Sequence, residues 1–356
     1  MFVFLVALAH ADDFELATLD ADPIINGVSA SAEDFPMAGG LLMDGLINLG
    51  GFGEQPLHSF VCSSTLIAPD VVLTAAHCID DYAFTFGFGT VDSLDVRWSR
   101  QSDLTSWDGS NPSAPWPDDA VAAWDWVAHP DFDMQAFDIG IAQNNDIALV
   151  FLDTPVTEIP HAYLPTNSLG ELLNVGDEVD VVGWGQQIAT SQFEASPAGS
   201  FAIKQQGKST ISELGAYEFQ VGALTEEVRK CHGDSGGPSF LEMDGALRVV
   251  GVTSHAYDDS DCFETGGVDT RVDPFLDWID EEMRIRCEDG TRAWCEVPGI
   301  VDPDSIDNGS NENDGSEDNE KRSGCSSTAT PAQWSLLLLG AMALGYRRRH
   351  SSTKIS

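Results

Sequence analysis

One eight-residue stretch, Cys231-His232-Gly233-Asp234-Ser235-Gly236-Gly237-Pro238, constrains this chain more than any other. A serine hydroxyl is a weak nucleophile until a base takes its proton and hydrogen-bond donors stabilise the resulting oxyanion. The glycines around Ser235 permit a tight turn that brings the N–H groups of Gly233 and Ser235 toward one oxygen. Asp234 supplies a carboxylate to hold such a turn. A glycine-rich surface turn is the alternative, and a base and an acid elsewhere in the chain would decide between the two.

A histidine and an aspartate of the required kind lie upstream. His77 follows the apolar run Val71–Leu73 closely, which predicts a position at the end of a strand. Asp146 lies at the start of Asn145–Val150, whose apolar residues predict another strand. The order His77, Asp146, Ser235 is one of three chain orders in which triads of the same geometry occur on unrelated folds.

The segments that carry these three residues resemble the motifs of the chymotrypsin/trypsin-like serine protease family. Thr74–Cys78 contains the histidine, Asn145–Val150 the aspartate and Cys231–Pro238 the serine. The resemblance covers most of the chain, with further matches at Ile24–Gly27, Gly183–Gly185 and Phe275–Ile279. Several motifs in one order are far more specific than a single motif.

The resemblance implies a role for each residue. His77 is the general base and then the general acid, Asp146 orients its imidazole, and Ser235 attacks the scissile carbonyl. The backbone N–H groups of Gly233 and Ser235 hold the oxyanion. Asp138 lies in a run that partly mimics the aspartate motif, but the segment around Asp146 matches that motif residue for residue. The mechanism needs no cofactor and no metal.

Short β-type runs broken by Gly, Pro, Asp and Asn predict an all-β barrel or sandwich. Examples are Val71–Thr74, Ala148–Leu152, Glu178–Val182 and Leu247–Thr253. The resemblance implies the more specific fold of two six-stranded antiparallel β-barrels with the active site between them. Val272–Arg284 has apolar residues at helical spacing and is similar to the family's C-terminal helix. Ser99–Asp125, with three tryptophans, predicts an inserted surface loop held by its own aromatic side chains.

The family is activated by a cut that frees an amine. The resemblance implies that the ammonium of Ile24 turns inward and pairs with Asp234, which shapes the oxyanion hole and the specificity pocket. A buried ion pair suits a switch because losing one partner is strongly destabilising. Pro23 precedes Ile24, whereas trypsin-like activators cut after Arg or Lys. We therefore expect a separate activating protease.

The two ends of the chain differ in composition from its middle. Residues 2–9 form a short apolar run before Ala9-His10-Ala11, which predicts a signal peptide over 1–11, with a buried N-terminal strand as the alternative. The acidic segment 12–23 is interpreted as a propeptide and 24–299 as the protease domain. Residues 300–324, rich in Asp, Glu, Asn, Ser and Gly, predict a disordered acidic linker.

Residues 325–356 contain Cys325, the apolar run Trp334–Leu344 and the cluster Arg347–Arg349. This layout resembles the C-terminal sorting tails of bacterial secreted proteins of the myxobacterial and GlyGly types. The run is short for a full membrane span, and the basic end fits the positive-inside rule. We expect a secreted or cell-surface protein exported from a bacterial cell, with transient membrane anchoring through this tail. A core helix is the alternative.

Seven cysteines suit an exported protein, because disulfides persist outside the cytosol. The resemblance implies one disulfide between Cys62 and Cys78 beside His77, and another between Cys231 and Cys262 across the specificity pocket. Cys287 and Cys295 enclose a segment short enough for a closed hairpin. Spacing alone does not determine connectivity.

The resemblance also implies a specificity pocket with Arg229 on its floor. Its walls are expected to include Ser254, His255, Ala256 and Gly267. A guanidinium there would repel basic side chains and could bind a carboxylate, which favours cleavage after Asp or Glu. If Arg229 instead turns outward or pairs with a nearby acid such as Glu226 or Glu227, the pocket would take small apolar side chains.

The charge excludes some partners. With 58 acidic and 17 basic residues the formal net charge is −41, which argues against binding to nucleic acid or to an anionic membrane surface. The expected partners are protein or peptide substrates and the activating protease. A non-catalytic binding protein on the same fold is the alternative function. An α/β-hydrolase esterase is excluded because its order is nucleophile, acid, histidine.

Overall fold

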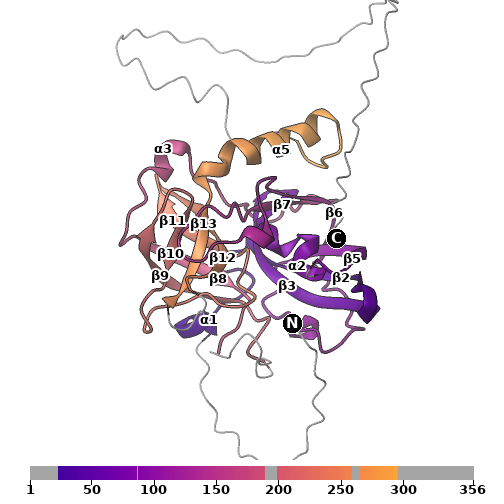
Figure 1. Cartoon of the computed structure of the whole chain (residues 1–356). Helices are drawn as coiled ribbons and strands as arrows, with labels where there is room; N and C mark the ends of the chain where they lie inside the picture. Colours follow the sequence, from indigo (N-terminus) through magenta and orange to yellow (C-terminus); the bar gives the residue numbers. More distant parts are fainter. Residues whose placement is uncertain (1–22, 86, 189–198, 259–264, 296–356) are drawn as a thin grey trace, which may run out of the picture. The chain divides into compact units, whose positions relative to one another are not determined.

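The structure, a computed structural model, describes residues 23–85, 87–188, 199–258 and 265–295 (Figure 1). All of them belong to one unit of the chain, Met1–Asn308. A second unit, Gly309–Ser356, lies outside the described residues. So do the predicted signal peptide, linker and tail, and nearly all of the predicted propeptide.

Six antiparallel strands close the first barrel in the order β2-β3-β4-β7-β6-β5. They are β2 (Ala38–Asn48), β3 (Glu54–Ala68), β4 (Val71–Thr74), β5 (Thr90–Ser99), β6 (Val121–Ala128) and β7 (Ala148–Leu152). Every residue of β4 and β7 is buried, which explains why both strands read as continuous apolar runs.

The second barrel is built from β8 (Glu178–Gly183), β9 (Gln205–Leu214), β10 (Glu218–Val221), β11 (Pro238–Met243), β12 (Ala246–Ala256) and β13 (Gly267–Arg271). Its sheet runs β9-β10-β13-β12-β11-β8, and β8 also pairs with β9, which closes the ring. The short strand β1 (Val28–Ser29) adds to β9 from outside the ring. The fold of two six-stranded antiparallel barrels is therefore confirmed.

In the described part of the chain, helices are few and short. They are α1 (Pro23–Asn26), α2 (Asp81–Thr85), α3 (Asn167–Gly170) and α5 (Leu276–Glu288), with single 3₁₀ turns at Gly50–Phe52, Ala76–Cys78, Thr105–Trp107, Met134–Ala136 and Asp273–Phe275. The C-terminal helix α5 buries Leu276, Ile279 and Met283, which lie on one face at helical spacing. These side chains join a core shared by residues of both barrels, so α5 packs across the two (Figure 1).

The inserted loop between β5 and β6 is anchored by an aromatic stack. Trp107 is fully buried and its ring lies 3.8 Å from that of His58 and 4.2 Å from that of Trp116. The guanidinium of Arg97 lies over Trp116 at 4.2 Å. The predicted loop was too long, because its last residues belong to β6. A register shift between Ala123 and Asp125 breaks the alternation that would have marked this strand.

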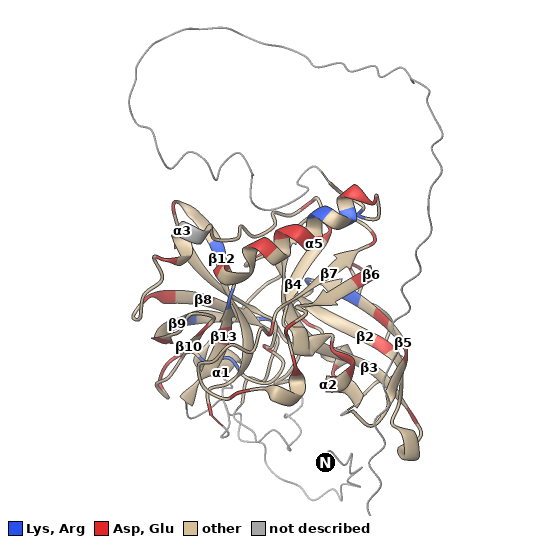
Figure 2. Cartoon of the chain, turned by 45° about the horizontal axis from the view of Figure 1, so that its top comes forward, with Lys and Arg blue, Asp and Glu red and all other residues tan. Residues whose placement is uncertain are grey.

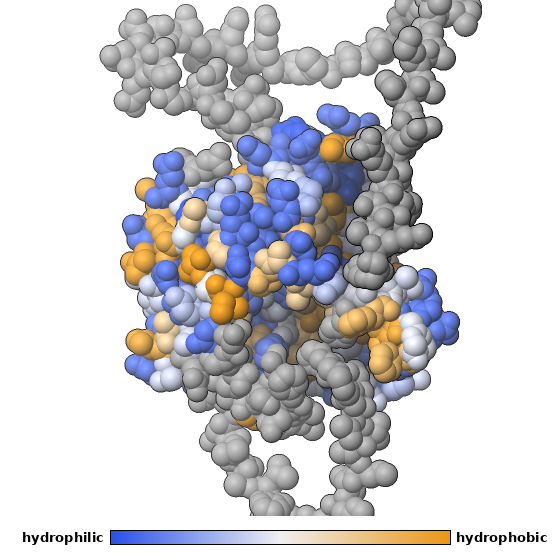
Figure 3. Space-filling model, viewed as in Figure 1, coloured by the Kyte–Doolittle hydropathy of each residue, from blue (hydrophilic) through white to orange (hydrophobic). Residues whose placement is uncertain are grey.

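Acidic residues far outnumber basic ones in this chain. Figure 2 shows Asp and Glu along α5 and at many strand ends, with few Lys and Arg. On the face drawn in Figure 3, apolar side chains are interspersed with hydrophilic ones, and α5 is mostly hydrophilic. Within the described part of the chain, no helix has the length and apolar character needed to cross a membrane.

Candidate active site

His77 lies in the 3₁₀ turn Ala76–Cys78 that follows β4. The disulfide between Cys62 and Cys78 ties this turn to β3. Thr74, the last residue of β4, donates its hydroxyl to the Ser63 carbonyl at 3.1 Å. The backbone beside His77 is therefore held on both sides, while 19% of its side chain remains exposed.

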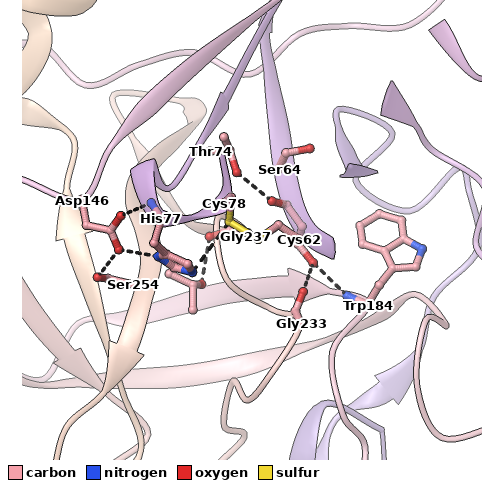
Figure 4. The surroundings of a disulfide bond; sticks show 12 residues. Cys62, Ser64, Thr74, His77, Cys78, Asp146, Trp184, Gly233, Gly237 and Ser254 are labelled. Atoms are coloured by element: carbon pink, nitrogen blue, oxygen red, sulfur yellow. Dashed lines mark hydrogen bonds and ion pairs between the residues drawn. A yellow bond between two sulfur atoms is a disulfide. The ribbon is translucent and has the colours of Figure 1, made fainter. Parts of the chain in front are cut away.

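Asp146 is fully buried and accepts three hydrogen bonds (Figure 4). Its Oδ1 accepts the backbone N–H of His77 at 2.9 Å, and its Oδ2 accepts His77 Nδ1 at 2.7 Å. Ser254 Oγ donates to the same Oδ2 at 2.5 Å. The hydroxyl of Thr270 on β13 also holds the Asp146 carbonyl at 3.1 Å. Elements of both barrels thus position this carboxylate.

The two groups shift each other's pKa. Burial lowers the pKa of His77, but the charge of Asp146 and its hydrogen bond outweigh this, so the pKa of His77 is raised. Burial raises the pKa of Asp146, but His77 and Ser254 outweigh it, so the pKa of Asp146 is lowered. The carboxylate stays ionised and directs the Nδ1 proton of His77, which leaves Nε2 as the ring nitrogen that can accept a proton.

Ser235 lies in the turn that leads into β11. The Ser63 N–H donates to the Ser235 carbonyl at 2.8 Å, which attaches the turn to the first barrel. The next residue, Gly236, has φ +77°, and a Cβ there would lie 2.1 Å from Thr74 Oγ1. Only glycine allows this approach, which brings Ser235 next to the end of β4, just before the turn that carries His77.

Two backbone donors of this turn are unused. Among the described residues, neither the Gly233 N–H nor the Ser235 N–H donates to a protein acceptor. Ser63 Oγ donates to the Gly233 carbonyl at 3.0 Å and so holds that peptide from the carbonyl side (Figure 4). The Ser235 hydroxyl makes no hydrogen bond to His77 within the described residues. Such contacts are often long before substrate binds.

Asp234 is fully buried behind the turn. The Cys231 and Gly185 N–H groups each donate to its carboxylate at 2.8 Å. Burial raises the pKa of Asp234 to about 6, although these bonds and the charge of Lys230 act in the opposite direction. Ile24 is also fully buried, in the core of the second barrel, and the neighbouring Ile25 carbonyl accepts the Arg229 N–H at 3.0 Å.

The two cations before Cys231 have different surroundings. Lys230 Nζ donates to both oxygens of Asp269 and to Ser239 Oγ, at 2.7 to 2.9 Å. Arg229 donates through Nη2 to the Thr225 carbonyl at 3.1 Å, while its buried Nε and Nη1 have no partner among the residues that the structure describes. Neither Glu226 nor Glu227 forms an ion pair with Arg229, although their negative charges act to raise its pKa.

The other predicted pocket residues lie at the ends of two paired strands. Ser254, His255 and Ala256 end β12, and Gly267 begins β13 directly opposite Ala256. Arg229 packs against Gly222, where a Cβ would lie 2.7 Å from Arg229 Cγ. Gly222 in turn lies against Gly266, which directly precedes β13. Of these residues, Ser254 uses its hydroxyl proton in the hydrogen bond to Asp146, so that proton is not available to a ligand.

A family model described as Trypsin matches residues 24–279. The chain belongs to the Trypsin family. This membership places it among the serine-type endopeptidases. It is 28% identical over 248 residues to a protein named Trypsin from Phaedon cochleariae, a match that covers 65% of this chain and 82% of that protein.

Longer proteins match over part of their length. The chain is 30% identical over 244 residues to Serine protease Hayan of Drosophila melanogaster, a match that covers 62% of this chain and 34% of Hayan. It is 28% identical over 274 residues to CLIP domain-containing serine protease HP8 of Bombyx mori, covering 72% and 69% respectively. The chain thus spans about a third of one curated relative and over two thirds of the other two.

The cysteines of this trypsin-family chain were largely predictable. The structure contains the Cys62–Cys78 and Cys287–Cys295 disulfides. Cys231 is also disulfide-bonded, and its expected partner Cys262 lies outside the described residues. Cys62, His77 and Cys78 lie close enough together to hold a metal ion, but sulfurs joined in a disulfide are not thiolate ligands.

Some residues that position the site carry no sequence signal. Ser63 holds the Gly233 carbonyl and the Trp184 N–H, and Thr270 holds the Asp146 carbonyl. Each is a common residue in the middle of a strand, more than a hundred positions from its partner. Only the pairing of the strands reveals their function. Asp138, the alternative aspartate, is exposed, and its backbone N–H and carbonyl bind the side chain of Asn144.

Proposed function

We propose that this protein is a secreted serine endopeptidase that hydrolyses peptide bonds through His77, Asp146 and Ser235. Ser235 Oγ attacks the scissile carbonyl while His77 Nε2 takes its proton. The N–H groups of Gly233 and Ser235 stabilise the oxyanion. His77 then protonates the leaving amine, which leaves an acyl-enzyme on Ser235. Water, activated by the same imidazole, hydrolyses this ester and restores the hydroxyl.

The orientation of His77 carries the proposal. Its Nδ1 is bound to a fully buried carboxylate at 2.7 Å, so its Nε2 is the nitrogen left for chemistry. The Ser235 turn packs on the same strand end through Gly236. A binding protein with no catalytic role would have no need for a buried aspartate held by three donors beside a partly exposed histidine.

Labelling and substitution test the proposal together. A fluorophosphonate should label Ser235 in the mature protein, and Ser235→Ala should lose both labelling and peptide hydrolysis while remaining folded. His77→Ala should also lose activity, and the double variant should be little worse than either single one, because triad members act as a unit. Ser110→Ala, an exposed serine of the inserted loop, is the control. Labelling of Ser235→Ala to the wild-type level, or absence of labelling in the wild type, would support the binding-protein alternative.

The proposal extends to maturation and location. Residues 1–11 act as a signal peptide, 12–23 as a propeptide, 24–299 as the protease domain, 300–324 as a linker and 325–356 as a tail that anchors the protein transiently at a membrane of a bacterial cell. An activating protease cuts before Ile24, and the new ammonium pairs with Asp234. Support comes from the burial of both residues and from the raised pKa of Asp234, which lacks a cationic hydrogen-bond partner among the described residues.

Protein or peptide substrates with an acidic residue before the scissile bond fit the pocket best. Lys230 is neutralised by Asp269, but Arg229 has no carboxylate partner within the described residues. A substrate carboxylate would supply that partner.

A further inference from the structure

A second histidine is connected to Asp146 through a serine. His255, near the end of β12, has its Nδ1 3.1 Å from Ser254 Oγ, the hydroxyl that donates to Asp146 Oδ2. On the other side of the ring, Nε2 lies 3.2 Å from the Gly140 carbonyl. Phe137 packs edge-on against the ring at 4.8 Å. His255 therefore bridges the Asp146 network and the loop that leads into it.

The protons available in this series of hydrogen bonds restrict the protonation state of His255. Asp146 is an ionised carboxylate and only accepts hydrogen bonds. Ser254 has a single hydroxyl proton, which it donates to Asp146 at 2.5 Å. Toward His255, Ser254 Oγ can therefore only accept. The Gly140 carbonyl can only accept as well.

Both ring nitrogens of His255 thus face acceptors. A neutral imidazole has one N–H and satisfies only one of the two contacts, whichever tautomer forms. An imidazolium has two N–H groups and satisfies both. The arrangement seen in the structure is complete only when His255 is protonated.

The loop that His255 contacts is otherwise held at its far end. Glu218 on β10 accepts the N–H groups of Ala142 and Asn144 at 2.8 and 3.1 Å. Asn145, with φ +55°, then turns the chain directly into Asp146. Gly140 lies in the sequence between Phe137 and the residues bound by Glu218. Among the described residues, the His255 ring is the only side chain that forms a hydrogen bond with Gly140. A change at His255 is transmitted toward Asp146 by two routes, through Ser254 and through the loop.

The charges around His255 oppose one another. Burial lowers its pKa, the Gly140 carbonyl and the carboxylates of Asp146 and Asp269 raise it, and the neighbouring His77 lowers it; the net pKa is lowered. His255 and His77 share Asp146, so a proton on one disfavours a proton on the other.

We propose that His255 is a positioning residue of the active site: a proton-linked clamp that, when charged, ties the 137–145 loop and Ser254 to Asp146. This inference rests on the proposed function of Asp146 and His77. With two protons His255 holds both contacts and leaves the Ser254 proton wholly to Asp146. With one proton it loses one contact.

Nuclear magnetic resonance of the ring nitrogens tests the clamp without any catalysis. In mature full-length protein carrying Ser235→Ala, His255 should gain its second ring proton in one step as the pH falls, after which both nitrogens carry a proton. His77→Gln should move that step to higher pH by removing a like charge, and Asp146→Asn should move it to lower pH. His161, which the same substitutions should leave unmoved, is the internal control. A His255 step that ignores both substitutions would overturn the inference.

Kinetics tests whether the clamp positions the site. His255→Phe should lower kcat by about three- to tenfold at the acid end of the activity range, the size of one hydrogen bond, and less at higher pH. Its effect should not add to that of Ser254→Ala. His161→Phe should match the wild type, and His255→Gln provides a second variant if the phenylalanine is not tolerated. An equal kcat loss at every pH would indicate a purely structural role, and wild-type kcat would exclude any role. Either result leaves the Ser235 test untouched, so the two proposals can fail separately.

Discussion

At the scale of single residues, the neighbouring cations Arg229 and Lys230 show how environment separates two similar side chains. Lys230 is buried against Asp269 and Ser239, which satisfy its three donors. Arg229 is only 5% exposed, and within the described residues its guanidinium makes one hydrogen bond, to the Thr225 carbonyl. Burial lowers the pKa of Arg229 because the charged form is poorly solvated there. A buried guanidinium with unused donors favours the binding of an anion.

Arg229 therefore predicts a preference for Asp or Glu on the acyl side of the scissile bond. Arg229→Ala should reduce kcat/KM for acidic peptides by about thirtyfold or more, the usual effect of removing one partner of a desolvated charge pair. It should have little effect on peptides with small apolar side chains. A peptide library scanned with mature enzyme measures both, with Arg284→Ala on α5 as the control.

Two results would contradict this pocket. Strong cleavage after Lys or Arg would be incompatible with a cation on its floor. An unchanged specificity in Arg229→Ala would show that the side chain does not line the pocket, and would leave the preference for small apolar residues as the better hypothesis.

Residues with a local signal were predictable and residues without one were not. His77, Asp146 and Ser235 lie in short motifs whose neighbours are themselves distinctive, such as the glycines on either side of Asp234 and Ser235. Ser254 was expected only in the wall of the pocket, whereas it donates to Asp146. The bond joins residues 108 positions apart, and no spacing in the sequence encodes it.

At the scale of elements, the strands were predictable where every residue of the strand is buried. β4 and β7 are buried throughout, so a simple apolar run marks each of them. The first residues of β6, 121–125, were predicted as loop because a bulge interrupts the pairing of this strand and because Trp124 is exposed between half-buried neighbours. The closure of the second barrel depends on β8 pairing with two strands, which a linear pattern does not reveal.

The turn that contains Asp234 predicts a pH-dependent stability of the uncut chain. The pKa of Asp234 is about 6 in the folded chain against 3.8 for the ordinary group. Between these values the folded chain holds a proton that the unfolded chain has lost, so the free energy of unfolding falls as the pH rises through this window. The loss amounts to about 3 kcal/mol, and an ammonium at Ile24 would remove it.

Asp234→Asn isolates this contribution, since asparagine does not titrate. With both chains uncut and carrying Ser235→Ala, the free energy of unfolding of the variant relative to the parent should rise by about 3 kcal/mol between pH 3.5 and pH 6.5. Urea unfolding at a series of pH values measures it. In chains cut before Ile24 the difference should disappear or reverse. Parallel curves in the uncut pair would refute the prediction.

At the scale of the whole molecule, the scarce cations are used inside the fold. Of the 17 Lys and Arg residues, Lys204, Lys230, Arg229 and Arg292 are each at most 6% exposed. They bind carbonyls or carboxylates that join separate segments, as Lys204 does with the Asp34 and Phe35 carbonyls. Along the ribbon in Figure 2, Asp and Glu far outnumber Lys and Arg. This arrangement suits a soluble acidic surface better than a binding site for any anionic polymer.

Arg292 ties the segment that follows α5 to the first barrel. Its guanidinium donates to both oxygens of Asp70, and the Trp294 N–H donates to the same carboxylate at 2.9 Å. The pair is buried, and the Cys287–Cys295 disulfide closes the hairpin that carries Arg292. Residues 292–295 therefore attach the segment that follows α5 to the first barrel.

Two truncations test this attachment. Ending the chain after Glu320 removes the proposed tail but none of the contacts described here, so the protein should fold with an unchanged midpoint of thermal unfolding, retain its kcat/KM and appear in the medium. Ending it after Gly290 removes Arg292 and Cys295 and leaves the Asp70 charge buried, which should cost about 3 to 5 kcal/mol of stability. Thermal unfolding and peptide hydrolysis compare both forms with the full chain. If the chain ending at Glu320 were misfolded or inactive, Trp334–Leu344 would belong to the core and not to a tail.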